Sequence, residues 1–465
     1  MEKKKIKVFQ VATECAPFAK VGGLGDVVPS LSKALFELGV NVSIFLPNYS
    51  FLKNFKFFNS FYFRGEKINV YYDFLEGTKI KIFLFEEKKF LKKHKIYEGP
   101  AFFSIKKFLL FSLLVSEFLK KFPFPKIVHC HDWHTAILPL ILKSREIKNT
   151  KSVLTIHNLS HQGKWNEKEI LNFLNLEKRI ESLEKRDKDG DFNILQQGIL
   201  NADTITTVSP TYSKEILTKD FGMGLENDLK KRKKDLFGIL NGIDTEVFDP
   251  EKDPYLKRNY SAKNFERKIE NKLELQKILK LKVDQKIPLF SFIGRLDFQK
   301  GIPLLINVLP FFKKLNSQVV ILGRGEKKFE EILKEISKKY PNVSIQIKFD
   351  LVLAQKIYGG ADFILMPSLF EPCGLVQMIA QKYGTIPIAR KTGGLSDTIE
   401  DGKTGFLFEK YNTFEFLKAI KRGIFAFKDK SIWKKMVKRA MEKDFSWKKS
   451  AKKYLSLYKK LINGL

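Results

Sequence analysis

Short apolar runs, separated by turn residues and by longer amphipathic stretches, recur along the first half of the chain. Runs of about four to eight apolar residues bounded by turn residues are typical of buried strands, and apolar positions three and four apart are typical of helices. The second pattern predicts a helix over residues 26–38. The runs that we interpret as strands are 5–13, 41–46, 127–130, 152–156 and 204–208.

A second series of the same kind begins near residue 288. Alternation of strands and helices favours parallel sheets, because each crossover between parallel strands takes a helix. Two such series predict an α/β protein with two Rossmann-like domains facing each other across a cleft. The predicted strands of the second series are 290–293, 318–322, 344–347, 363–366 and 385–388.

The pattern also divides the chain. We predict a first domain over 1–245, a linker over 246–285, a second domain over 286–444, and a C-terminal helix, within 445–465, that crosses back to the first domain. Pro250 and Pro254, among mixed charges, mark the linker. Two further regions, 49–105 and 160–193, look like irregular insertions, with a hairpin around Gly77.

Composition agrees with a globular protein. Hydrophobic residues make up 44% of the 465 positions and charged residues 29%. No run of about eighteen apolar residues exists, so we expect no membrane-spanning helix. Lys7 and Glu14 interrupt the apolar stretch that an export signal would need. With only three scattered cysteines, the sequence indicates a reducing cytoplasm.

The net charge of +32 raises the question of nucleic-acid binding. Lysine far outnumbers arginine, the basic residues spread along the whole chain, and no arginine cluster of the kind that reads bases or phosphates occurs. We therefore expect no nucleic-acid partner, although the charge can help to attract an anionic substrate. A polyanion-binding module is the non-enzymatic alternative, and salt-dependent nucleic-acid binding without any enzymatic activity would favour it.

One motif occurs twice. Lys20-Val-Gly-Gly-Leu-Gly-Asp26 follows the first predicted strand, and Lys391-Thr-Gly-Gly-Leu-Ser-Asp397 follows a strand of the second series. Glycines let a backbone approach a phosphate closely, and a following helix N-terminus favours its charge. The spacing fits neither the dinucleotide fingerprint nor the P-loop. A tight turn is the alternative interpretation of one copy, and a second copy in an equivalent setting weakens it.

The first copy belongs to a longer signature that resembles bacterial glycogen synthases and plant starch synthases. The resemblance implies a GT-B fold and retaining transfer of glucose from ADP-glucose to the non-reducing 4-hydroxyl of an α-1,4-glucan. It implies no metal and no cofactor. The segments that carry it, in order along nearly the whole chain, are 13–26, 131–134 (HDWH), 155–159 (TIHNL), 207–212 (TVSPTY), 238–244 (GILNGID), 294–296 with Lys300-Gly301, and 370–375 (FEPCGL).

Transfer from a nucleotide diphosphate sugar requires cations on the departing phosphates and stabilisation of an oxocarbenium-like sugar. Arg295 and Lys300 can supply the cations, and the resemblance places the matching residues on the diphosphate. The resemblance places the Glu371 carboxylate beside the sugar. The alternative for Arg295 and Lys300 is a solvated charged loop, and the alternative for Glu371 is a helix cap. By resemblance, the donor-binding residues are Lys20, Gly22, Gly23, Asn241, Phe349, Cys373, Gly374, Leu375 and Val376.

Some of these positions depart from the pattern or have a second interpretation. Val376 stands where relatives often carry threonine, and Ile379 stands where the wider superfamily has a ribose-binding glutamate. Phe349 is either a residue that stacks on the donor base or an ordinary core residue. Val21 replaces a threonine common in bacterial enzymes, so UDP-glucose remains an alternative donor.

Histidines cluster in His129-Cys-His-Asp-Trp-His134, which invites a zinc site. Strand alternation would point Cys130 away from His129 and His131, so we predict no metal. The resemblance places His157 by the donor sugar, with catalytic Glu371, Arg295 and Lys300. It places the acceptor and sugar side at Asp26, Tyr97, Asp132 and His134.

Two other enzymes of the same fold remain open: another retaining GT-B nucleotide-sugar transferase with a small acceptor, and a sugar-nucleotide epimerase. Only a synthase would place label from the donor into a glucan polymer. The sequence carries no signal for oligomeric state.

Overall fold

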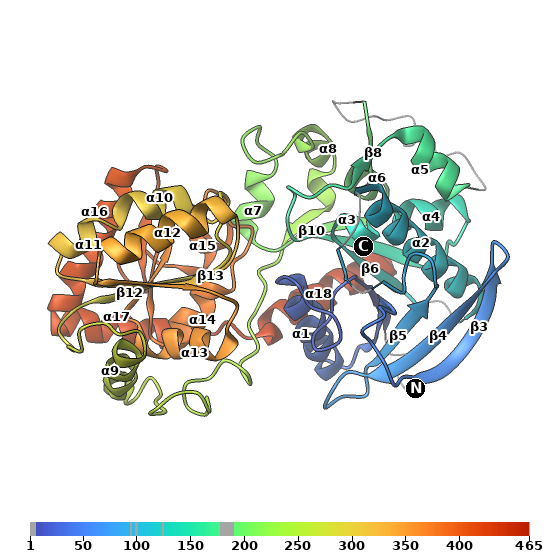
Figure 1. Ribbon diagram of the computed structural model, residues 1–465. Helices are drawn as coiled ribbons and strands as arrows, with labels where there is room; N and C mark the ends of the chain where they lie inside the picture. Colours follow the sequence, from blue (N-terminus) through green and yellow to red (C-terminus); the bar gives the residue numbers. More distant parts are fainter. Residues whose placement is uncertain (1–5, 94, 98–100, 123–124, 177–189, 465) are drawn as a thin grey trace. The chain divides into compact units, whose positions relative to one another are not determined.

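The computed structural model describes residues 6–93, 95–97, 101–122, 125–176 and 190–464, which form two compact units (Figure 1). Unit 1 comprises Met1–Gly242 together with Trp447–Leu465, and unit 2 comprises Ile243–Ser446. The C-terminal helix therefore returns to unit 1, as predicted. The start of the first predicted strand, at residue 5, lies outside the described residues.

Unit 1 is built on a nine-stranded sheet in the order β11-β10-β7-β6-β1-β2-β5-β4-β3. The pairs from β11 to β5 are parallel, whereas β3, β4 and β5 pair antiparallel. A separate two-stranded ribbon joins β8 (Lys164–Trp165) to β9 (Phe192–Asn193). The strands of the large sheet are β1 (Lys7–Val11), β2 (Asn41–Pro47), β3 (Lys56–Phe63), β4 (Glu66–Phe74), β5 (Lys81–Glu86), β6 (Ile127–His131), β7 (Lys151–Ile156), β10 (Thr204–Thr207) and β11 (Leu236–Gly238).

Helix α18 (Trp447–Asn463) packs beside α1 (Leu24–Glu37), although the two are separated by most of the chain (Figure 1). Its buried positions Trp447, Tyr454 and Tyr458 recur at helical spacing, so a single face enters the core of unit 1. The other helices of unit 1 are α2 (Ala101–Lys121), α3 (Asp132–Thr135), α4 (Leu138–Ser144), α5 (Glu167–Leu174), α6 (Ile194–Asn201), α7 (Pro210–Glu215), α8 (Glu226–Lys231) and η2 (Lys233–Asp235).

Unit 2 contains a six-stranded, fully parallel sheet in the order β14-β13-β12-β15-β16-β17. Numbered within the unit this is 3-2-1-4-5-6, the order of doubly wound dinucleotide-binding folds. Its strands are β12 (Leu289–Ile293), β13 (Gln318–Gly323), β14 (Val343–Ile347), β15 (Phe363–Met366), β16 (Ile386–Arg390) and β17 (Phe406–Phe408). Its helices are η3 (Phe265–Arg267), α9 (Lys268–Ile278), α10 (Ile302–Val308), α11 (Phe311–Lys314), α12 (Lys327–Lys339), α13 (Leu351–Gly360), α14 (Val376–Lys382), α15 (Gly393–Thr398), α16 (Thr413–Lys428) and α17 (Lys430–Glu442).

All ten strands predicted from the apolar runs are present, with ends shifted by at most two residues within the described part of the chain. The hairpin around Gly77 is confirmed, because β4 and β5 pair antiparallel across it. The segment 246–285, marked as a linker by its composition, includes α9, whose Leu275 lies in the core of unit 2. No helix among the described residues is long and apolar enough to cross a membrane.

The prediction of an irregular region over 49–105 is wrong, because β3, β4 and β5 extend the main sheet there. Most positions of β3 are exposed or half-buried, so its apolar and polar residues do not alternate cleanly. A second omission is α2, which is apolar around most of its circumference where its side chains are described. A helix buried on all sides has little of the periodicity from which helices are recognised.

Candidate active site

The candidate residues leave the strands at one special place in each sheet. In unit 1, β1 pairs with β2 on one side and β6 on the other, so the connections from β1 and β6 diverge. In unit 2, β12 pairs with β13 on one side and β15 on the other, so the connections from β12 and β15 diverge in the same way. Loops that leave such a switch point at the carboxyl ends of parallel strands form the usual ligand site of a doubly wound sheet.

In unit 1 the first glycine loop, residues 20–26, is held by a side chain. Oε2 of Glu14 accepts hydrogen bonds from the backbone N–H groups of Val21 (2.6 Å) and Gly22 (2.8 Å). The Tyr97 hydroxyl donates to Oε1 of the same carboxylate at 2.6 Å. Glu14 itself is only 3% exposed, so a buried charge is stabilised by three donors.

Gly22 and Gly23 of the first glycine loop have open space beside them. A methyl group added to Gly23 would meet no described atom within 4 Å, and one on Gly22 would touch only Oε1 of Glu14 at 4.0 Å. Lys20 Nζ forms an ion pair with Asp26 Oδ1 at 2.6 Å, and both side chains are well exposed. No steric demand of the described residues explains the two glycines, which leaves room for a ligand over the loop.

The backbone just after β7 is held by Asp132, the first residue after β6. Asp132, at φ +55°, accepts hydrogen bonds through Oδ1 from the backbone N–H groups of His157 (2.7 Å) and Asn158 (3.3 Å). Burial raises the pKa of Asp132 to about 7, and these two bonds oppose the rise. The His157 ring lies 2.9 Å from the His131 ring, Nε2 to Nδ1.

Two other candidates in unit 1 carry buried polar atoms that no described residue satisfies. They are Nδ1 of His134 and Oδ1 of Asn241. Buried polar atoms are normally hydrogen-bonded, so each is a natural contact for a bound hydroxyl or water. The Tyr97 ring lies against His134, with centroids 5.2 Å apart.

In unit 2 the loops after β12 and β15 meet in an ion pair. Lys300 Nζ lies 2.7 Å from Oε2 of Glu371, and Ser368 donates to the same oxygen at 3.0 Å. Glu371 is buried, whereas the Lys300 side chain is 22% exposed. The alternative interpretation of a merely solvated loop is therefore wrong for Lys300, and Glu371 makes a tertiary ion pair that a helix cap alone would not.

Backbone packing holds these two loops together. Leu369 N–H donates to the Gln299 carbonyl at 2.8 Å. Gly301, at φ +75°, sits so close to Pro367 that a methyl group there would lie 1.9 Å from the Pro367 carbonyl oxygen. Arg295 stays exposed, with Nη2 3.1 Å from Oε1 of Gln299 and 3.4 Å from the Asp297 carboxylate.

The second glycine loop, residues 391–397, packs on the Glu371 loop. Gly394 N–H donates to the Glu371 carbonyl at 3.1 Å. A methyl group on Gly394 would lie 2.1 Å from the Cys373 carbonyl oxygen, and one on Gly393 (φ +44°) would lie 2.0 Å from that of Glu371. Lys391 instead reaches an exposed ion pair with Glu409 at 2.9 Å.

The remaining donor-side candidates of unit 2 differ in exposure. Phe349 is 78% exposed, so the interpretation of an ordinary core residue is wrong. Cys373 is buried, while Gly374, Leu375 and Val376 at the start of α14 are half-buried. Gln377 Nε2 donates to the carbonyls of Cys373 and Gly374 at 2.9 Å, which fixes the turn into α14.

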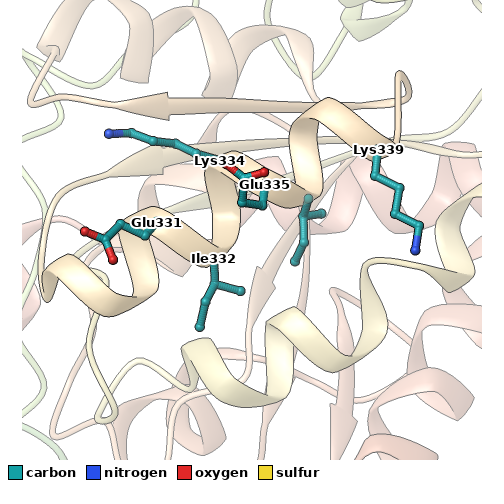
Figure 2. A pocket seen from close by; sticks show the side chains of 6 residues that line it. Glu331, Ile332, Lys334, Glu335 and Lys339 are labelled. Carbon is teal, nitrogen blue, oxygen red and sulfur yellow. The ribbon is translucent and has the colours of Figure 1, made fainter.

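Among the residues that the structure describes, no group of three His, Cys, Asp or Glu side chains could hold a metal ion. His129 and His131 share one face of β6, with ring centroids 4.4 Å apart. A surface hollow on α12 contains none of the candidate residues (Figure 2). It is lined by Glu331, Ile332, Lys334, Glu335, Ile336 and Lys339.

Sequence reasoning assigned no site role to four residues that the structure places around the candidates. Glu14 had a signal, a carboxylate just after a buried strand inside the strongest motif, and Gln10 had one as a polar residue within the apolar strand Lys7–Val11. His131 stood inside a motif without a role of its own. Ser368 carried no signal, because its contact with Glu371 depends on the turn between them.

Comparisons with known proteins cover both units. The family model "Starch synthase catalytic domain" matches residues 7–231, and "Glycosyl transferases group 1" matches residues 274–442. Glycogen synthases of Thermodesulfovibrio yellowstonii and Fervidobacterium nodosum are both 40% identical, over 98% of this chain and 98% and 99% of theirs. The catalytic domain of Arabidopsis thaliana starch synthase IV, solved with ADP and acarbose, is 34% identical with a TM-score of 0.89 over 99% of this chain and 100% of that chain.

Proposed function

Since the chain belongs to the family of bacterial glycogen synthases and plant starch synthases, we propose that it transfers glucose from ADP-glucose to the non-reducing 4-hydroxyl of an α-1,4-glucan with retention of configuration. The family and the GT-B fold class predicted from the sequence are confirmed by the full-length likeness. Within this proposal, residues 1–245 bind the acceptor and residues 286–444 bind the nucleotide sugar.

The Lys300–Glu371 pair is the observation that carries the proposal. It joins the two loops that leave the switch point of the unit 2 sheet, where a doubly wound fold binds its ligand. The ammonium group is partly exposed and available to a second anion, such as a departing diphosphate. The carboxylate favours positive charge on the sugar as the bond to the phosphate breaks.

The proposed step is a front-face displacement. The bond from the anomeric carbon to the phosphate oxygen breaks, and the glucan 4-hydroxyl oxygen bonds to that carbon on the same face. The leaving phosphate accepts the hydroxyl proton. In unit 2, Arg295 and Lys300 neutralise the phosphate and Glu371 stabilises the sugar, while in unit 1 His157 contacts a sugar hydroxyl.

Donor choice has support from one relative and one residue. The starch synthase IV structure holds ADP, and Phe349, exposed next to the end of β14, offers a face on which a purine can stack. We therefore propose ADP-glucose as the preferred donor and UDP-glucose as the alternative.

Labelled transfer tests the activity. Purified protein is incubated with ADP-[14C]glucose and glycogen, and label in the precipitated polymer is counted. We expect Glu371→Gln and Lys300→Ala to reduce kcat by at least about a hundredfold, the scale of a lost transition-state contact. The matched control is Glu335→Gln, which removes an exposed ion pair with Lys338 on α12 and should leave turnover unchanged. Normal turnover of Glu371→Gln would overturn the assignment of Glu371.

The same assay with UDP-[14C]glucose tests the donor. A higher kcat/KM for ADP-glucose supports the proposal, and a higher value for UDP-glucose replaces it with the alternative. Label that never enters polymer with either donor would instead favour a transferase with a small acceptor.

A further inference from the structure

A chain of three buried or half-buried side chains connects the first strand to His157. Gln10 lies in β1, His131 ends β6 and His157 follows β7, so the chain crosses three neighbouring strands. Oε1 of Gln10 lies 2.8 Å from Nε2 of His131, and Nδ1 of His131 lies 2.9 Å from Nε2 of His157. Gln10 and His131 have no exposed surface.

The proton positions in this chain follow from the first contact. With the Gln10 amide oriented as in the structure, its oxygen faces His131 and only accepts, so Nε2 of His131 carries a proton and donates. Burial holds the pKa of His131 well below its usual value, so the ring is neutral and its Nδ1 is an acceptor. The 2.9 Å contact then requires a proton on Nε2 of His157.

His157 is therefore left with one free nitrogen. Burial lowers its pKa to about 3, so this ring is neutral as well, and with Nε2 protonated its Nδ1 carries a lone pair. No described residue forms a hydrogen bond with that Nδ1. The backbone of the same residue is fixed independently, because its N–H donates to Asp132 at 2.7 Å.

We propose that Gln10 and His131 are positioning residues that hold His157 in one orientation and one tautomer, with Nδ1 free to accept a hydrogen bond from a hydroxyl of the transferred glucose. The inference rests on the proposed function for the identity of the sugar. It adds the reason why His157 presents an acceptor nitrogen, and not an N–H group, to the sugar. A group fixed before substrate arrives does not have to be ordered during the reaction.

The opposite arrangement is well defined and makes the proposal testable. If the Gln10 amide were reversed, its NH2 group would donate to His131, and His131 would donate to His157. His157 would then present an N–H group, which donates to the sugar instead of accepting. The tautomer of His157 therefore reports directly on the chain.

The first experiment reads that tautomer without using the activity. The protein is labelled with 15N-histidine, and two-dimensional NMR at about pH 7.5 distinguishes protonated from unprotonated ring nitrogens. His157 is assigned from the signal lost in His157→Asn. We expect a protonated Nε2 and an unprotonated Nδ1. A protonated Nδ1, or a mixture of the two forms, overturns the proposal.

The second experiment compares two substitutions of His131 in the transfer assay. His131→Asn keeps an oxygen near the position of Nδ1 that can accept the His157 N–H, whereas His131→Phe keeps the size of the ring and removes the acceptor. We expect kcat to fall by about tenfold to a hundredfold in His131→Phe, the range found when a group that orients a functional histidine is removed. Donor KM should change little, and His131→Asn should restore most of the loss.

The matched control is His129→Phe. His129 is equally buried on the same strand, but its ring nitrogens contact Tyr458 (2.7 Å) and Thr155 (2.6 Å) and do not reach His157. Because phenylalanine keeps a ring that can stack on His131, whose centroid lies 4.4 Å from that of His129, we expect the kcat of His129→Phe to stay close to that of the wild type. Equal losses in His129→Phe and His131→Phe would indicate structural damage alone and overturn the positioning role.

A third variant covers poor folding of His131→Phe. Gln10→Leu keeps both histidines and removes only the acceptor that sets the first proton. We expect the NMR spectrum to show mixed tautomers at His157, and an unchanged single tautomer would overturn the role of Gln10. Because the NMR result requires no donor, an enzyme that transfers no glucose but shows the expected tautomer would refute the proposed function and leave the chain intact.

Discussion

The two glycine loops have nearly the same sequence, and each follows the carboxyl end of a parallel strand, yet they are built in different ways. In unit 1 the N–H groups of Val21 and Gly22 are held by the Glu14 side chain, and Gly22 and Gly23 face open space. In unit 2 the glycines press against the backbone of the loop that carries Glu371.

The difference shows that one local sequence can serve two physical needs. A glycine without steric neighbours in its own chain leaves room for something else to approach, which fits a ligand-binding loop. Where a methyl group added to a glycine would lie about 2 Å from a carbonyl oxygen, packing alone requires the glycine. The second loop therefore supports the Glu371 loop, and the first is the better candidate for donor contact.

The largest expected effect separates the two loops by substitution of their glycines. Gly394→Ala should destabilise unit 2 by about 3 kcal/mol and abolish transfer, because its methyl group overlaps the Cys373 carbonyl. Gly23→Ala should leave the free energy of unfolding unchanged and raise the donor KM. Chemical denaturation and the labelled-transfer assay measure the two quantities. Equal destabilisation by both substitutions would remove the distinction between the loops.

Lowering the pH should destabilise unit 1 more than unit 2, which extends the comparison from the two loops to the two units. His129, His131 and His134 are buried in unit 1. Burial lowers the pKa values of His129 and His134 to about 3, and it holds the pKa of His131 well below its usual value. The unfolded chain therefore binds more protons below about pH 6.5, and unit 1 loses about 1 kcal/mol per histidine by about pH 5.5. Asp132, whose pKa is raised to about 7, acts in the opposite direction and offsets part of this loss.

Unit 2 contains none of the six histidines, which all lie in the first 161 residues. Hydrogen exchange at about pH 7.5 and about pH 5.5, corrected for intrinsic rates, should show lost protection in unit 1 peptides first. Earlier loss in unit 2 would contradict the assignment of acid sensitivity to the buried histidines.

The third effect concerns Glu14, for which the second loop has no counterpart. Glu14→Ala leaves two N–H groups and the Tyr97 hydroxyl without their shared acceptor, and should cost about 2 kcal/mol and increase hydrogen exchange over residues 20–26. Glu14→Gln keeps an oxygen acceptor and should lose about half as much. If Glu14→Ala left the exchange of this loop unchanged, the carboxylate would not be what holds it.

The smallest effect compares the two lysines. Lys20 and Lys391 both form exposed ion pairs, which contribute little to stability, so neither alanine substitution should alter folding. We expect Lys20→Ala to raise the donor KM by about tenfold and Lys391→Ala to leave it unchanged. A larger loss of donor affinity in Lys391→Ala would reverse the ranking of the loops.

Much of the fold could be predicted from the chain alone, because a buried parallel strand is a short apolar run that any packing arrangement must hide from water. The ten strands located this way include β1 and β6 at the switch point of unit 1, and β12 and β15 at the switch point of unit 2. Strand β3 and helix α2 escaped prediction for opposite reasons, since one is mostly exposed and the other is buried around most of its surface.

The sequence by itself determined the family, the two α/β units and the candidates Lys300 and Glu371, because motifs fix residue types at strand ends. Only the tertiary structure decided that these two residues form an ion pair 71 positions apart, that Glu14 holds the first loop and that Gln10 reaches His157 through His131. It also made the two glycine loops unequal. The physical reason is that a motif specifies which groups a loop contains, whereas their partners come from other strands that only the folded sheet brings within hydrogen-bond distance.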